Sequence, residues 1–143
     1  MSIFISIASY QDPLLASTIK SACMKASAEQ DLVFGVCDQS SSPIDASSLS
    51  KKAKIHYEHI DPILSKGPCW ARNRLQSFYQ GEDYFLQIDS HTQFDKDWDV
   101  ILMDQLKSLQ GLSSEPYFSK PIITAYPRSF EVISIKDEEF KLK

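Results

Sequence analysis

The run from Tyr84 to Ile88 is short and almost entirely apolar, and Asp89, Ser90 and His91 follow it at once. Such a run is typical of a central strand covered on both faces, because neither side alternates with solvent. In extended backbone, side chains two residues apart point the same way, which would let Asp89 and His91 bind one ion. A carboxylate with an imidazole suits Mn²⁺ or Mg²⁺, and the carboxyl end of a strand is where open α/β sheets bind ligands.

Strand and helix patterns alternate along the rest of the chain. Apolar runs predict further strands at 3–8, 32–37, 55–60, 122–125 and 130–135. Apolar residues at helical spacing predict helices over 15–26, 69–79 and 98–109, with Trp98 in the core. This order predicts one domain over residues 1–143, an α/β/α sandwich with a mainly parallel sheet. The charged segment 136–143 is expected to fray.

Composition argues against several classes of function. The net charge of −4 argues against a nucleic-acid partner, because such binding depends on clustered Lys and Arg. No apolar run approaches the ~20 residues that a membrane span requires, so we expect no membrane partner. The apolar stretch 3–8 has no basic residues before it and fits a strand better than a signal peptide. Cys23, Cys37 and Cys69 show no close pairing, so we expect reduced, mostly buried thiols in a cytoplasmic protein.

Two local signals bear on the loops that precede helices. Asp12 followed by Pro13 is typical of a helix N-cap with proline in the first turn. The dipeptide Gly67-Pro68 interrupts the chain, and the helix expected after it carries Arg72 and Arg74 near its start. A guanidinium can donate paired hydrogen bonds to phosphate oxygens, so these arginines are chemically suited to a phosphate ligand.

The sequence Tyr-Phe-Leu-Gln-Ile-Asp-Ser-His-Thr-Gln-Phe at 84–94, followed by Trp98-Asp99, resembles a known family of glycosyltransferases. These are the UDP-GlcNAc-dependent polypeptide glycosyltransferases that modify hydroxyproline in a cytoplasmic ubiquitin-ligase subunit. The Asp-Ser-His also looks like the aspartate-x-histidine motif of the polypeptide GalNAc-transferases. The resemblance extends from Ile3 to about Tyr126 and is strongest at 6–12, 67–81 and 84–99.

This resemblance implies a GT-A-like fold, a UDP-sugar donor, GlcNAc transfer with retention of anomeric configuration, and a protein hydroxyl as acceptor. It implies that Asp89 and His91 hold Mn²⁺ or Mg²⁺ and that Ser90 adjoins the nucleotide. Arg72 would approach the phosphates or support Asp89, and the cation with Arg72 would stabilise the departing UDP. These three residues, Arg72, Asp89 and His91, are the catalytic candidates.

The same resemblance makes Ser9, Tyr10 and Asp12 candidates for contacting uridine. The alternatives for these residues are that Tyr10 covers the sheet edge and that Asp12 only caps a helix. Arg72 has a similar alternative, a solvent-exposed arginine paired with Glu82 or Asp83.

The family continues beyond the segment that resembles this chain, so the resemblance implies a partial, C-terminally truncated GT-A-like domain. The residues that grip the acceptor, and a further histidine that often completes the metal shell, lie beyond that segment. Two other functions therefore stay open: a remnant that binds nucleotide sugar with weak or no turnover, and a plain α/β interaction module. Only the first of these two predicts that Mn²⁺ and UDP bind together.

Overall fold

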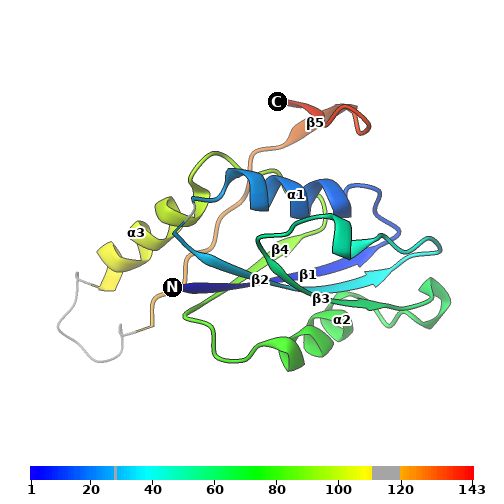
Figure 1. The fold of residues 1–143 in the computed structure, drawn as a ribbon, viewed down its shortest axis with the longest axis horizontal. Coiled ribbons are helices and arrows are strands. Elements are labelled where there is room, and N and C mark those ends of the chain that lie inside the picture. The colour runs from blue at the N-terminus through cyan, green and yellow to red at the C-terminus, as the bar shows by residue number, and fades with distance from the viewer. Residues whose placement is uncertain (28, 111–119) are drawn as a thin grey trace.

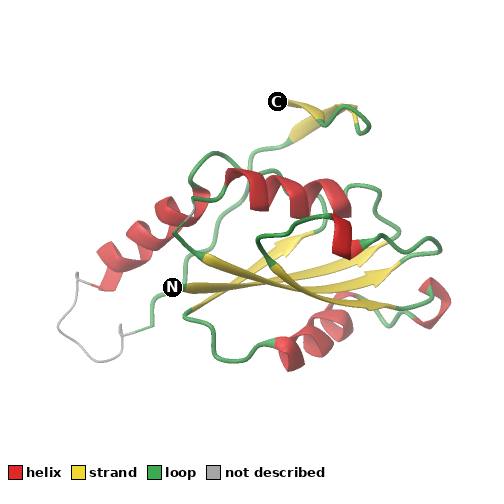
Figure 2. Ribbon diagram, in the orientation of Figure 1, coloured by secondary structure: helices red, strands yellow, loops and turns green. Residues whose placement is uncertain are grey.

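A computed structural model of the chain describes residues 1–27, 29–110 and 120–143. Its centre is a four-stranded parallel sheet in the order β3-β2-β1-β4. The strands are β1 (Ser2–Tyr10), β2 (Asp31–Gln39), β3 (Lys54–His59) and β4 (Tyr84–Asp89). All four run in the same direction, so their carboxyl ends meet at one edge of the sheet (Figure 2).

Helices cover both faces of this sheet. Helices α1 (Leu15–Lys25) and α3 (Trp98–Gln110) lie on one face, and α2 (Pro68–Leu75) lies on the other (Figure 1). Short 3₁₀ turns, η1 (Ala46–Ser48), η2 (Pro62–Leu64) and η3 (Gln76–Phe78), complete the connections. The expected α/β/α sandwich with a parallel sheet is confirmed.

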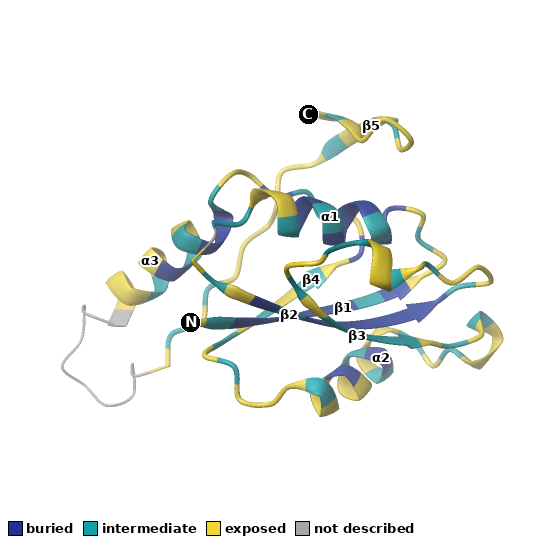
Figure 3. Ribbon diagram, viewed as in Figure 1, coloured by how far each residue is buried: buried dark blue, intermediate teal, exposed yellow. Residues whose placement is uncertain are grey.

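Alternation along β1 divides the core into two layers, because successive side chains of a strand point to opposite faces. Ile3, Ile5 and Ile7 face α1 and α3 and form a large apolar cluster with residues such as Ile19 and Phe34. On the other face, Ala71 and Leu75 of α2 form a smaller buried cluster with Cys37 of β2, and Ala8 and Trp70 pack against its border. Figure 3 shows β1 and β2 as the most deeply buried strands.

Strand β4 differs from its prediction as a central, doubly covered strand. Among the described residues it pairs only with β1, so it is an edge strand, and its side chains alternate between half-buried and exposed. Tyr84, Leu86 and Ile88 pack against the large cluster, whereas Phe85 is 46% exposed. Helix α2 packs on β1 and β2, which leaves the outer face of β4 partly bare. The apolar run 84–88 therefore corresponds to a strand with one covered face, whereas it predicted a strand covered on both faces.

The C-terminal predictions are corrected in two places. Residues 122–125 form no strand: Pro121 and Pro127 flank them, and proline cannot donate a ladder hydrogen bond. The segment 136–143 does not fray completely, because β6 (Glu139–Leu142) pairs antiparallel with β5 (Phe130–Ser134). The rings of Phe130 in β5 and Phe140 in β6 also pack edge to face, with centroids 5.4 Å apart. The strand predicted at 130–135 is confirmed.

Hydrogen bonds join the start of α3 to the end of α1. Trp98 is buried, as expected, and its indole Nε1 donates a 3.0 Å hydrogen bond to the carbonyl of Ala22. The fully buried Asp99 accepts hydrogen bonds from the amide of Ser27 at 2.9 Å and from its hydroxyl at 2.7 Å. The Trp98-Asp99 pair therefore has a structural role, since it joins α3 to the end of α1.

Two further expectations concern cysteines and membranes. All three cysteines lie in the described residues and are free, but only Cys37 is fully buried; Cys23 is half-buried and Cys69 is exposed in the first turn of α2. Burial raises the pKa of the Cys37 thiol to about 11, with the nearby Glu58 carboxylate adding to the effect. In the ranges that the structure covers, no helix combines the length and apolarity needed to cross a membrane.

Candidate functional site

The predicted site residues collect at the carboxyl edge of the sheet. Ala8 of β1 lies opposite Asp89 of β4, and Tyr10 lies opposite Gln39 of β2, so the loops after these strands are neighbours. Two groups of residues are connected there by side-chain contacts. The first joins Asp12 to the loop after β4, and the second joins α2 to the end of β4.

In the first group, Asp12 is the centre of a hydrogen-bonded network. Its Oδ2 accepts from the Ser90 hydroxyl at 2.7 Å and lies 2.8 Å from His91 Nδ1. Its Oδ1 accepts from the Leu14 amide at 2.9 Å. Burial raises the pKa of Asp12, but the hydrogen bonds from Ser90, His91 and Leu14 outweigh burial and lower the pKa below its ordinary value.

The expected cap at Asp12 is only partly confirmed. Helix α1 begins at Leu15 with Leu14 at its N-cap, two residues later than the Asp12-Pro13 signal predicts. Asp12 still accepts a hydrogen bond from a backbone amide two residues ahead, which is the geometry of an Asx turn. One carboxylate oxygen therefore binds the backbone at the start of α1, and the other contacts the Ser90 and His91 side chains.

In the second group, Arg72 of α2 contacts Asp89 of β4. One terminal guanidinium nitrogen lies 3.2 Å from Asp89 Oδ1, and the Arg72 Nε is buried without a hydrogen-bond partner among the described residues. Its alternative partners are engaged elsewhere: Asp83 accepts from the Ser2 amide, and Glu82 accepts from the Gln80 amide. The arginine is thus turned toward the end of β4, beside a carboxylate that is 64% exposed.

A hollow of about 370 Å³ lies at the same edge of the sheet, between the ends of β1 and β2 and the start of α2. Its lining consists of Ala8, Ser9, Tyr10, Gln39, Ser65, Gly67 and Pro68. Ser9 and Tyr10, two of the candidates for uridine, are in this lining, and Asp12 is absent from it. The Ser9 hydroxyl is buried without a hydrogen-bond partner in the described part of the chain. Because side chains alternate along β1, this hydroxyl points to the face that carries Ile5, Ile7 and α1, so Ser9 does not offer it to the hollow on the α2 side.

Sequence reasoning missed the residues that frame this hollow. The buried Gln39 donates from its amide nitrogen to the carbonyl of Ser9 at 2.9 Å and accepts from the Ser65 hydroxyl at 2.6 Å. It therefore ties the end of β1 to the loop before α2. Gly67, the N-cap residue of α2, has a φ of +90°, a conformation that favours glycine. The available signal was that Gln39 ends a strand whose carboxyl edge carries the other candidates.

Three hydroxyl groups of α1, also missed, hold the loop after β4. Thr18 Oγ1 donates to the Ser90 carbonyl at 2.7 Å and accepts from the Thr92 amide at 3.0 Å. Ser21 Oγ accepts from the Phe94 amide at 3.1 Å, and Ser17 Oγ pairs with the Gln93 side chain at the same distance. Hydroxyl residues are weak helix formers, so three within five positions of a helix were a readable signal.

Arg74 does not join the site. Its Nε donates to Glu58 Oε2 at 2.9 Å, a terminal nitrogen contacts Glu58 Oε1, and its guanidinium lies 5.1 Å from the centre of the Trp70 ring. The hydrogen bonds from Arg74 lower the pKa of Glu58, although burial opposes the effect. Arg74 is therefore part of an ion pair between α2 and β3.

This ion pair predicts an acid-sensitive share of stability. Because the folded pKa of Glu58 lies below its ordinary value of 4.5, the contribution is complete above that pH and is lost as the pH falls through the folded pKa. Urea unfolding midpoints between about pH 6 and about pH 3 are expected to fall less in Glu58→Gln than in the wild type. Midpoints that fall in parallel in the two proteins would contradict this role.

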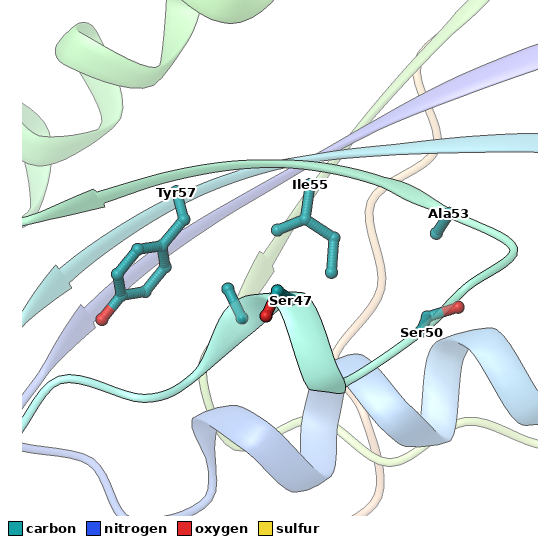
Figure 4. A pocket seen from close by; sticks show the side chains of 6 residues that line it. Ser47, Ser50, Ala53, Ile55 and Tyr57 are labelled. Atoms are coloured by element: carbon teal, nitrogen blue, oxygen red, sulfur yellow. The ribbon is translucent and has the colours of Figure 1, made fainter.

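A second hollow, of about 350 Å³, lies between η1 and β3, away from all predicted site residues. Figure 4 shows Ile55 and Tyr57 of β3 beside Ser47 of η1. The Tyr57 hydroxyl donates to Asp38 Oδ2 at 2.6 Å and accepts from the Ile44 amide at 3.2 Å. Burial, with the Asp38 carboxylate, raises the pKa of this phenol. The small side chains and the satisfied hydroxyl give this hollow no evident chemistry.

Within the described ranges, no group of three or more His, Cys, Asp or Glu side chains is arranged to hold a metal ion. The extended backbone expected from Asp89 to His91 ends at Asp89, because residues 90 and 91 form a turn, and the two side chains contact different partners, Arg72 and Asp12. The side chains of Asp89 and His91 are 64% and 60% exposed, so both are accessible to an ion and its further ligands.

Comparison with known proteins bears on both the fold and the family. No curated protein matches the chain. The crystal structure of Staphylococcus aureus TarS residues 1–349 is similar, with a TM-score of 0.58 and 18% sequence identity over 77% of this chain. The chain spans 33% of that TarS chain. At this identity the likeness shows the fold, which is that of a GT-A-like glycosyltransferase.

The family model described as glycosyltransferase (GlcNAc) matches residues 2–53 and 41–142. These two segments together include both groups of site residues and nearly all of the sequence. The chain belongs to the GlcNAc glycosyltransferase family.

Proposed function

We propose that the chain binds UDP-GlcNAc at the carboxyl edge of the sheet and serves transfer of GlcNAc to a protein hydroxyl. The observation that carries this proposal is that Arg72 and Asp89 meet at the same edge of the sheet as the hollow lined by Ser9 and Tyr10, where Ala8 of that lining lies opposite Asp89. The hollow can take the base, the Arg72 guanidinium can bind the diphosphate, and the Asp89 carboxylate can hold a divalent cation for it. A nucleotide sugar needs these three features. Family membership supports the choice of GlcNAc.

The residues at the end of β4 fit a divalent cation. Asp89 and His91 offer a carboxylate and an imidazole, both largely exposed, and this donor set suits Mn²⁺ or Mg²⁺. Diphosphate oxygens and water would complete the shell, as is usual for Mg²⁺ bound with nucleotides. A bound divalent cation supplies Lewis-acid stabilisation of negative charge on a departing diphosphate.

The chain's own residues have distinct parts in this proposal. Ser9 and Tyr10, at the end of β1, contact the uracil or ribose from the lining of the hollow. Arg72 donates to the phosphates, and Ser90 lies at the phosphate side of the site. Charge on the departing UDP is then stabilised in part by the guanidinium. Asp12, which the family resemblance also assigns to uridine, faces Ser90 and His91 instead of the hollow.

The finer points of the proposal rest on the sequence resemblance. They are retention of anomeric configuration, hydroxyproline as the acceptor and a cytoplasmic location. TarS covers much more sequence than this chain does, so acceptor binding and turnover are tested separately from donor binding.

Calorimetric titration of UDP, with Mn²⁺ and with a chelator, tests donor binding. We expect the wild type to bind UDP only with Mn²⁺, and both Asp89→Ala and His91→Ala to abolish the metal-dependent heat. Asp45→Ala, which removes the cap of η1 far from the site, is the matched control and is expected to bind as the wild type does. Absence of UDP binding under every condition would overturn the proposal and favour the interaction module.

Turnover is then followed as release of UDP from UDP-GlcNAc, with and without a peptide that contains hydroxyproline. A mass increase of one GlcNAc on the peptide supports the transferase. Metal-dependent binding of UDP without any transfer would instead support the nucleotide-sugar-binding remnant.

A further inference from the structure

Asp12 and His91 are 79 positions apart in the sequence and form a direct contact in the fold. The Asp12 side chain is 15% exposed, whereas the His91 side chain is 60% exposed. A mostly buried carboxylate therefore holds one nitrogen of an imidazole whose ring is largely in solvent. Ser90, the first residue after β4, donates from its hydroxyl to the same carboxylate oxygen at 2.7 Å.

The chemistry of this contact determines where the His91 proton is. An ionised carboxylate only accepts hydrogen bonds, so the His91 Nδ1 must carry the hydrogen that points to Asp12 Oδ2. In the neutral imidazole, Nε2 is then the nitrogen with a free lone pair. Nε2 makes no hydrogen bond to the residues that the structure describes, which leaves it available to a ligand.

The other contacts of Asp12 make it a fixed partner for His91. Its Oδ1 is occupied by the Leu14 amide, which anchors the carboxylate to the start of α1. Its Oδ2 is shared by Ser90 and His91. With these three donors in place, Asp12 is poorly suited to bind uracil or the ion itself, and well suited to orient the imidazole ring.

We propose that Asp12 is a positioning residue that fixes the Nδ1-protonated tautomer of His91 and so presents Nε2 to a divalent cation. The inference rests on the proposed function, because it concerns the cation of the proposed nucleotide-sugar site. Carboxylates that hold the second nitrogen of a metal-binding histidine typically change metal affinity by about 10- to 100-fold when they are removed.

The sharpest variant is Asp12→Asn. Asparagine is nearly isosteric, and its carbonyl oxygen can still accept from the Leu14 amide. Its amide nitrogen would then face Ser90 and His91 as a donor, so His91 Nδ1 must accept and the proton must move to Nε2. The substitution therefore preserves the turn and reverses the tautomer. Asp45→Asn makes the same chemical change at the cap of η1 and is the control.

The first readout is the tautomer in the metal-free protein, measured near pH 8 by long-range proton–nitrogen NMR of labelled histidines. His91→Ala identifies the His91 signals among those of His56 and His59. We expect the wild type and Asp45→Asn to carry the His91 proton on Nδ1, and Asp12→Asn to carry it on Nε2. A wild-type His91 protonated on Nε2 would overturn the inference without any variant.

The second readout is Mn²⁺ affinity in the presence of UDP, measured by electron paramagnetic resonance. We expect Asp12→Asn to weaken Mn²⁺ binding about 10- to 100-fold and Asp45→Asn to leave it unchanged. Unchanged Mn²⁺ affinity in Asp12→Asn, with a wild type that does bind, overturns the positioning role alone. A wild type that binds no Mn²⁺ with UDP overturns the proposed function together with this inference.

Discussion

Replacing Arg72 with methionine is expected to weaken UDP binding by about 10- to 100-fold. A hydrogen bond to a charged group is worth roughly 1.5–3 kcal/mol, and about 1.4 kcal/mol corresponds to a factor of ten in affinity. Arg72 has a buried Nε without a partner among the described residues, and one of its terminal nitrogens already contacts Asp89. Titration calorimetry with UDP and Mn²⁺ at fixed ionic strength measures the loss.

Arg74→Met is the matched control for this experiment. Arg74 lies on the same helix, carries the same charge, and is already paired with Glu58 and stacked on Trp70. We expect its replacement to change UDP affinity by less than about threefold, as a distant surface charge does. Arg72→Lys keeps the charge without the planar fork and is expected to fall between the wild type and Arg72→Met. Equal losses in Arg72→Met and Arg74→Met would mean that only net charge matters.

The largest effect on stability is expected from Phe4→Ala, a loss of about 3–5 kcal/mol in the free energy of unfolding. The Phe4 ring is fully buried on the α2 side of the sheet and contacts Tyr79 and Phe85, with centroids 5.7 and 5.3 Å away. It also lies over Gly35 of β2. Urea unfolding measures the loss, and Phe85→Ala is the control: Phe85 is 46% exposed, so we expect less than half the effect.

The absence of a side chain at Gly35 makes room for this ring. A Cβ at position 35 would meet the tip of the Phe4 ring at 2.5 Å, so Gly35→Ala is expected to destabilise by about 1–3 kcal/mol through overpacking. Combining it with Phe4→Leu, which removes the tip of the ring, should relieve most of that penalty. Strictly additive losses in the double variant would show that the two residues do not compete for space.

The general fold was readable from the sequence because apolar runs mark β1 and β2 and apolar residues recur at helical spacing in the helices. The position of β4 in the sheet was not readable, since the run 84–88 has the composition of a central strand although only one of its faces is well covered. Composition cannot report which neighbours a strand has. The false strand at 122–125 had a similar origin: its residues are apolar, but the flanking prolines and the lack of a pairing partner decided the outcome.

The site was readable where it depends on strand ends and unreadable where it depends on contacts between distant loops. Asp89, His91 and Arg72 were predicted from local spacing and family resemblance, and the structure places all three near the carboxyl end of β4. The contact of Asp12 with His91 was not, because nothing in a single sequence indicates that these positions meet across 79 residues. Gln39 was missed for the same reason, since its hydrogen bonds join loops from two different strands.

The hydroxyl groups of α1 have a consequence for the thermodynamics of ligand binding. Thr18, Ser21 and Ser17 hold the backbone and one side chain of the loop that follows Asp89 through hydrogen bonds within the protein. Fixing a backbone residue otherwise opposes association by roughly 1–2 kcal/mol of conformational entropy. A loop already ordered by folding avoids that loss, so more of the contact energy remains as affinity. Helix α1 thus preorganises the loop, so the conformational entropy of the loop backbone is lost when the protein folds and not when a ligand binds.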